Sequence, residues 1–226
     1  MTTTLPPLSA VSRPALRHDV VNGLLRSIFL GEMPAGTRLV IQKLAQQLNV
    51  SSTPVREALL KLEAVGLVKF YHNRGAVVKR FGAAELREIY HLRRVLEAEA
   101  TACACGKIDE ATLRRLQQEF LILAGDDSGA NWSHRAMAAD RELHDTIARQ
   151  CGNARLADEI ERYNMLVQIG RDLVGNQLQA QKNAVQEHLE IVDALLRNDA
   201  KDAAGWMAKH IDHTCDIVAT VMFPPA

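Results

Sequence analysis

Apolar residues recur at helical spacing through the first third of the chain. One run starts near Ala15 and stops before Gly31, with its apolar positions at Leu16, Val20, Leu24 and Ile28. After a turn at residues 33–36, a shorter run predicts a second helix that ends near Asn49. Ser51 is placed to cap a third helix over residues 52–65, and Pro54 is tolerated in its first turn. Two short helices joined by a tight turn indicate a helix-turn-helix.

The third predicted helix has two distinct faces. Its inward face carries Val55, Leu59 and Leu62, and its outward face carries Ser52, Thr53, Arg56 and Leu60. Two runs of strand type follow, over 67–71 and 76–80, around the turn-rich residues 72–75. A helix-turn-helix followed by a hairpin is a winged helix-turn-helix with a basic wing tip.

From Ala83 onward the pattern is helical almost throughout. The first two helices have predicted buried stripes at Leu86, Ile89, Leu92 and Leu96, and at Leu113, Leu116 and Phe120. Further helices are expected over 131–150, 154–175, 180–198 and 200–221, with breaks short enough for an antiparallel bundle.

The predicted fold is therefore mainly α, and the chain divides into three parts. Residues 1–14, with three prolines and no periodic pattern, form a loose arm. A winged helix-turn-helix with a small β-hairpin occupies residues 15–80. An all-helical domain occupies residues 81–226.

Charge separates the two folded parts. The whole chain has 27 basic and 27 acidic residues, but residues 1–80 have 11 lysines and arginines against 4 acidic residues, a net charge of +7. The remainder has 16 against 23, a net charge of −7. A basic first third indicates that this part meets a polyanion. The chemistry suits DNA, because arginine pairs with guanine in the major groove and serine, threonine and helix amides bind bases or phosphates.

The composition of the chain also predicts where in the cell the protein is located. No apolar run approaches the roughly 18–20 residues of a membrane span, and the first residues lack the pattern of a signal peptide. The four cysteines form no C-x-x-C pair and are expected to be reduced thiols. We expect a cytoplasmic protein that does not bind a membrane.

Several spaced elements of the first third occur together in one known family. The runs Gly31-Glu-Met-Pro-Ala-Gly-Thr-Arg-Leu39, Val50-Ser-Ser-Thr-Pro-Val-Arg-Glu-Ala-Leu59 and Gly66-Leu67-Val68 closely resemble the DNA-binding domain of GntR-family bacterial transcription regulators. The resemblance covers residues 15–80 and implies a double-stranded DNA operator. It implies DNA contacts at Thr53 and Arg56, and at Gln42, Ser52, His72 and Arg74. The family usually has arginine at position 52, so Ser52 indicates a different operator sequence.

The C-terminal part carries a candidate metal site. Asp140 and His144 are four residues apart and share one helical face, while His188 and His210 occur on two later helices among apolar neighbours. One carboxylate and three imidazoles suit zinc, nickel, manganese, iron or cobalt. Such a short pattern also arises by chance on ordinary helices, and the residues alone leave that alternative open.

This ligand set is similar to that of the FCD effector domain in the FadR subfamily of GntR regulators. The run Tyr90-His-Leu-Arg-Arg-Val-Leu-Glu97 resembles the first-helix signature of that domain. The resemblance implies a divalent transition metal, with zinc favoured, and a small carboxylate effector contacted by Arg93. An Arg93–Glu97 surface pair is the alternative for that arginine. His213 and His91 are the competing histidines, and the family register favours His210.

We therefore expect a ligand-responsive repressor, not an enzyme, that binds a palindromic operator as a homodimer. Protein two-fold symmetry requires operator two-fold symmetry. A metal-dependent enzyme with an accessory DNA-binding domain is the alternative, and an architectural DNA-binding protein is another. The enzyme leaves the basic winged domain unexplained, and the architectural protein leaves the histidines unexplained.

Overall fold

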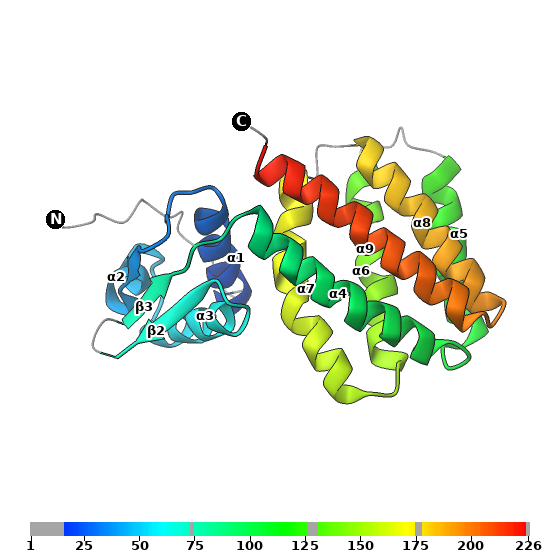
Figure 1. Cartoon of the computed structure of the whole chain (residues 1–226), viewed down its shortest axis with the longest axis horizontal. Coiled ribbons are helices and arrows are strands. Elements are labelled where there is room, and N and C mark those ends of the chain that lie inside the picture. Colours follow the sequence, from blue (N-terminus) through cyan, green and yellow to red (C-terminus); the bar gives the residue numbers. More distant parts are fainter. Residues whose placement is uncertain (1–15, 73–74, 126–130, 175–177, 225–226) are drawn as a thin grey trace. The chain divides into compact units, whose positions relative to one another are not determined.

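A computed structural model describes residues 16–72, 75–125, 131–174 and 178–224, with only the backbone for 16–18 and 165–174. The predicted arm, residues 1–14, lies outside this part of the chain. The described residues divide into two compact units, residues 1–82 and 83–226. Figure 1 shows the helices and strands of each unit.

The N-terminal unit is built from three helices and a small sheet. Its helices are α1 (Leu16–Phe29), α2 (Ile41–Gln47) and α3 (Ser52–Ala64). α1 packs on α3, and Val20, Leu24 and Leu59 of these two helices have none of their surface exposed. Burial of such side chains contributes about 1.5–3 kcal/mol each. The predicted helix-turn-helix is confirmed.

The turn before α3 and the two ends of that helix have defined local conformations. Asn49, in the turn between α2 and α3, has φ of 52°, a left-handed conformation that asparagine tolerates. Ser51 occupies the N-cap position of α3, but its side chain makes no capping hydrogen bond. Gly66 ends the helix at φ of 79°, where the Leu67 amide donates to the Leu62 carbonyl.

The wing is a three-stranded sheet, one strand more than the hairpin that the sequence predicts. Strands β2 (Val68–Tyr71) and β3 (Gly75–Val78) pair antiparallel, with Val68 opposite Val78 and Tyr71 opposite Gly75. Strand β1 (Arg38–Leu39) pairs with the other edge of β3, giving the order β1-β3-β2. β1 has only two residues, which is too short to produce an alternating pattern in the sequence.

The C-terminal unit is an all-helical bundle, as predicted. Its helices are α4 (Ala83–Ala104), α5 (Glu110–Gly125), α6 (Trp132–Gln150), α7 (Ala154–Val174), α8 (Leu178–Leu196) and α9 (Ala200–Met222). α9 packs along both α4 and α8, and α8 packs on α5 (Figure 1). The predicted α5 stripe is confirmed, because Leu113, Leu116 and Phe120 are buried.

The predicted buried stripe of α4 is wrong. Leu92 is 46% exposed, Ile89 and Leu96 are half-buried, and only Leu86 faces the core. The helix instead buries Tyr90, Arg93, Glu97, Ala100, Thr101 and Ala104 beside Leu86. An apolar stripe and a partly charged buried face therefore run along different sides of the same helix.

Candidate metal centre and DNA-reading face

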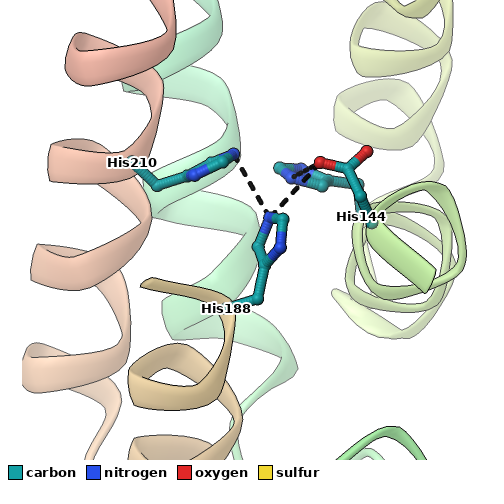
Figure 2. A group of neighbouring side chains, drawn as sticks. His144, His188 and His210 are labelled. Carbon is teal, nitrogen blue, oxygen red and sulfur yellow. Dashed lines mark hydrogen bonds and ion pairs between the residues drawn. The ribbon is translucent and has the colours of Figure 1, made fainter. Parts of the chain in front are cut away.

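Four candidate ligands converge inside the C-terminal unit. Asp140 and His144 come from α6, His188 from α8 and His210 from α9. All four are buried, and one ligating atom from each lies within 4.8 Å of every other. Figure 2 shows the three imidazoles turned toward one another. The structure thus brings together the full set of residues that the sequence predicted as metal ligands.

Helical periodicity places these side chains inside. On α6, Asp140 and His144 are in register with the buried Ala136, Leu143 and Ile147. His188 likewise shares the buried face of its helix with Val185 and Ile191, and His210 with Met207 and Ile211. Each polar group is carried inward by apolar neighbours on its own helix.

The spacing of the ligating atoms fits a metal ion. His188 Nε2 lies 3.3 Å from His210 Nε2 and 3.3 Å from an Asp140 carboxylate oxygen, which is 3.8 Å from His144 Nε2. For bonds of about 2.0–2.1 Å, neighbouring ligands of a tetrahedral ion are roughly 3.3 Å apart. The two 3.3 Å separations match this spacing, and the other pairs of ligating atoms lie within 4.8 Å.

Two glutamates that the sequence did not connect with the metal site orient the histidines. Glu97 lies 2.5 Å from His144 Nδ1, and Glu187 lies 2.9 Å from His210 Nδ1. A carboxylate at Nδ1 holds the proton there and leaves Nε2 as the lone-pair donor, as is typical of metal-binding histidines. His144 Nε2 has no hydrogen-bond partner among the described residues. This orientation is the strongest sign that the residues fit a metal.

Arg93 is bonded to the first of these glutamates. Its Nε and Nη2 atoms each lie 2.9 Å from the same Glu97 oxygen, and its guanidinium carbon is 4.8 Å from the centre of the Tyr90 ring. The Arg93–Glu97 pair therefore exists, but the expectation of a surface pair is wrong, since Arg93 is 2% exposed. A chain of contacts runs from Arg93 through Glu97 to His144.

The two competing histidines lie outside the four-residue cluster. His213 is 52% exposed and its Nδ1 contacts the second oxygen of Glu187. His91 is exposed on α4. Glu187 therefore joins the buried His210 to the exposed His213, and His210 is the member that faces the cluster.

Burial and neighbouring groups control protonation here. Burial, together with the nearby His188, lowers the pKa of His210 to about 3, against the opposing effect of Glu187. Burial raises the pKa of Glu187, but the hydrogen bonds and charges of His210 and His213 outweigh it and hold that pKa below its usual value. A neutral imidazole is the form that coordinates a metal.

A cavity of about 80 Å³ adjoins the cluster. Its described lining includes three of the four candidate ligands, Asp140, His188 and His210. The remainder comes from α6, α8 and α9, at Ala136, Met137, Ala180, Gln181, Ala184, Val185, Thr214, Ile217 and Val218. A metal held by the cluster would have this space beside its open coordination positions. Arg93 is not among the described lining residues.

The residues predicted to contact DNA lie on the surface of the N-terminal unit. Gln42 on α2 and Ser52, Thr53 and Arg56 on α3 are all exposed. The inward residues of α3 are buried as predicted, and Leu60 beside the polar face is 52% exposed. His72 is exposed at the end of β2, and Arg74 lies outside the described residues.

Comparisons with known proteins identify both units. The model of bacterial regulatory proteins of the gntR family matches residues 16–78, and the FCD domain model matches residues 88–213. The chain belongs to the GntR family. This member of the family is a transcriptional regulator with a DNA-binding domain and an FCD effector-binding domain. The matches give no support to the enzyme alternative.

Relatives of this GntR regulator align along most of its length. It is 25% identical to the HTH-type transcriptional repressor RspR of Escherichia coli over 97% of this chain and 93% of that protein. It is 26% identical to the Nta operon transcriptional regulator of Aminobacter aminovorans, over 83% and 87%. The solved structure of E. coli McbR/YncC shares the fold, with a TM-score of 0.64, 24% identity and coverage of 92% and 97%. No helix among the described residues is long and apolar enough to cross a membrane.

Proposed function

We propose that this GntR regulator is a repressor whose DNA binding responds to a small organic acid held at a metal ion in the C-terminal unit. The observation that carries the proposal is the buried cluster of Asp140, His144, His188 and His210, with glutamates that preset Nε2 of two ligands. The adjoining cavity gives the acid a place beside the metal. Repression is supported by the relative RspR, which is named a repressor.

The four cluster residues would hold a divalent transition metal, with zinc favoured and nickel, manganese, iron or cobalt as alternatives. A bound metal supplies a positive centre that attracts a carboxylate. The chain's own residues prepare this site, since Glu97 and Glu187 orient the imidazoles. For Arg93 we propose a positioning role, because its two bonds hold Glu97 in place.

On DNA, the exposed polar face of α3 would enter the major groove. Thr53 and Arg56 would contact base edges, and Gln42, Ser52, His72 and Arg74 would bind nearby bases or phosphates. Serine at position 52 is shorter than arginine and uncharged, so this position would select a different base from the one that the family usually selects.

We expect Arg56→Ala to weaken specific operator binding by roughly 1–3 kcal/mol and to reduce base preference, because arginine is the side chain best suited to pair with guanine. Arg74→Ala, which removes a charge from the wing, should instead lower the salt dependence by about one counterion with little change in preference. Mobility shifts on operator and scrambled DNA at several salt concentrations separate the two effects. Unchanged specific affinity in Arg56→Ala would exclude α3 as the reading helix.

The exposed apolar stripe of α4 supports a homodimer. Leu92 is 46% and Val95 51% exposed, and the half-buried Ile89 and Leu96 extend the same stripe. Helical residues three or four apart are neighbours, so these side chains form a continuous patch. A second copy of the chain would bury this patch against its own, as two-fold symmetry requires.

We expect Val95→Asp to shift the protein from dimer to monomer and to weaken operator binding, because a carboxylate would be buried in the dimer interface. Leu121→Asp is the matched control, since Leu121 is 50% exposed on α5 and its neighbour Ile122 points to a different side of that helix. Sedimentation at micromolar concentration distinguishes the two variants. A dimeric Val95→Asp protein would place the interface elsewhere.

The effect of an acid on DNA binding is tested with the DNA that flanks the gene encoding this protein. Metal-loaded and chelator-treated protein are compared in mobility shifts, with and without candidate acids. The proposal expects an acid to change operator affinity in the metal-loaded protein alone, as differential binding to two states requires. An acid response that survives complete removal of metal would contradict it.

A further inference from the structure

We propose that the effector is a short aliphatic monocarboxylate, with its carboxylate at the metal and its hydrocarbon tail in the cavity beside the cluster. This inference rests on the proposed function and names the chemical class that the site selects. It depends on how polar and apolar groups are distributed around the cavity, whose described lining has its charged and metal-binding groups together at the cluster.

The polar end of the cavity is the cluster itself. Asp140, His188 and His210 line the cavity, whereas His144 is not among its described lining residues. An acid that enters the cavity would therefore approach the metal from the side of these three ligands. Its carboxylate would bind there, and the rest of the molecule would extend away from the metal.

The walls along which the tail would lie are mainly hydrocarbon. They include Ala136 and Met137 of α6, Ala184 and Val185 of α8, and Ile217 and Val218 of α9. Apolar surface of this kind stabilises a bound alkyl chain in proportion to the apolar area removed from water. It offers nothing to a second charged group.

The other polar lining groups are uncharged. They are the Thr214 hydroxyl and the Gln181 amide, and the described lining contains no lysine or arginine. Arg93, for which the family resemblance implies an effector contact, is hydrogen-bonded to Glu97 and is not among the described lining residues. A second carboxylate on the ligand would lose its water without gaining a cation, which is costly. The cavity therefore favours a single acid group.

The size of the cavity sets how much of the tail can be enclosed. A water molecule needs roughly 10–15 Å³ of such space, so 80 Å³ holds roughly five to eight groups of that size. That corresponds to a monocarboxylic acid of about four to six carbons. Alanine at positions 136, 180 and 184 keeps this space open, because larger side chains there would fill it.

Pentanoate and glutarate are the matched probes for this proposal. Both have five carbons in a chain, and glutarate carries a second carboxylate where pentanoate has a methyl group. Metal content is measured first on the full-length protein by elemental analysis, which tests the proposed function independently. Binding of each acid to the metal-loaded protein is then measured by calorimetry. We expect pentanoate to bind at least about tenfold more tightly than glutarate.

Ala184→Leu should abolish pentanoate binding while metal content stays at the wild-type level, because leucine fills the cavity beside an intact ligand set. Ala208→Leu is the matched control, since Ala208 is on α9 and does not line the cavity among the described residues. Glutarate binding as tightly as pentanoate would overturn the inference and leave a metal-held acid in place. Metal-loaded protein that binds neither acid at millimolar concentration would also overturn it.

Discussion

A divalent metal ion should raise the melting temperature of the C-terminal unit, and His188→Ala should remove most of that rise. Ligands on α6, α8 and α9 converge on one point, so a bound ion cross-links three helices of the folded state. At a free metal concentration about 100 times the Kd, the folded state gains about 2.7 kcal/mol. For a unit of this size that corresponds to roughly 5–10 °C.

The two tryptophans make this measurement specific to the C-terminal unit. Trp132 is on α6 and Trp206 is on α9, and the chain has no others. Their fluorescence therefore reports the unfolding of the helices that carry Asp140, His144 and His210. Metal content by elemental analysis gives the stoichiometry, which we expect to be one ion per chain.

His188→Ala should lower metal affinity by more than about 100-fold, the upper range for removing even an outer-shell partner. His91→Ala is the control, because that imidazole is exposed on α4 and outside the cluster. Operator binding without effector should persist in both variants, since the reading residues belong to the N-terminal unit. Wild-type protein that contains no stoichiometric metal and gains no stability from added divalent ions would remove the metal from the mechanism.

The sequence predicts the helices well because most of their buried faces are apolar and periodic. α4 is the exception, and its error has a physical cause. The helix buries Arg93 and Glu97, which a pattern of hydrophobic positions assigns to the surface, and it exposes Leu92 and Val95. These two side chains can be buried because their opposite charges pair with each other. Arg93 and Glu97 pair within α4, four residues apart, and Glu97 also contacts His144 on α6. Neither contact leaves a hydrophobic periodicity in the sequence.

The cluster of candidate ligands could be predicted, but the groups that orient them could not. The four-residue spacing of Asp140 and His144 on one helix identifies them as candidates, and a family resemblance identifies His188 and His210. Glu97 acts on His144 from another helix, 47 positions away in the chain, so no local spacing connects them. Glu187 does precede His188 directly, yet it orients His210. The packing of α8 on α9 is needed to show that Glu187 contacts His210.

Metal-free protein should lose stability in acid, with His210 responsible for the upper part of the pH range. Its pKa is about 3 in the folded state and 6.5 when unperturbed, because burial and His188 disfavour the protonated ring. Between these values the unfolded chain binds a proton that the folded chain does not. The free energy of unfolding therefore falls as pH falls from about 6.5 toward 3, by up to about 1.4 kcal/mol per pH unit.

Glu187 acts in the same direction but in a lower window. Its folded pKa lies below the ordinary value of 4.5, so the stability that it contributes is present above that value and is lost as pH falls through the folded pKa. Between pH 6.5 and 4.5 the lowered pKa of His210 therefore reduces the free energy of unfolding by roughly 2 kcal/mol. His210→Gln should flatten this interval, because glutamine does not titrate.

Urea titrations followed by tryptophan fluorescence, in the presence of chelator, measure this loss at each pH. His91→Gln makes the same chemical change on an exposed side chain and should keep the wild-type slope. The chelator keeps the protein metal-free, because in the metal-loaded protein protons and metal would compete for the same imidazoles. If His210→Gln and the wild type lose stability in parallel between pH 6.5 and 4.5, then His210 is not the group that couples acid to unfolding, and its burial in the cluster must be incomplete in solution.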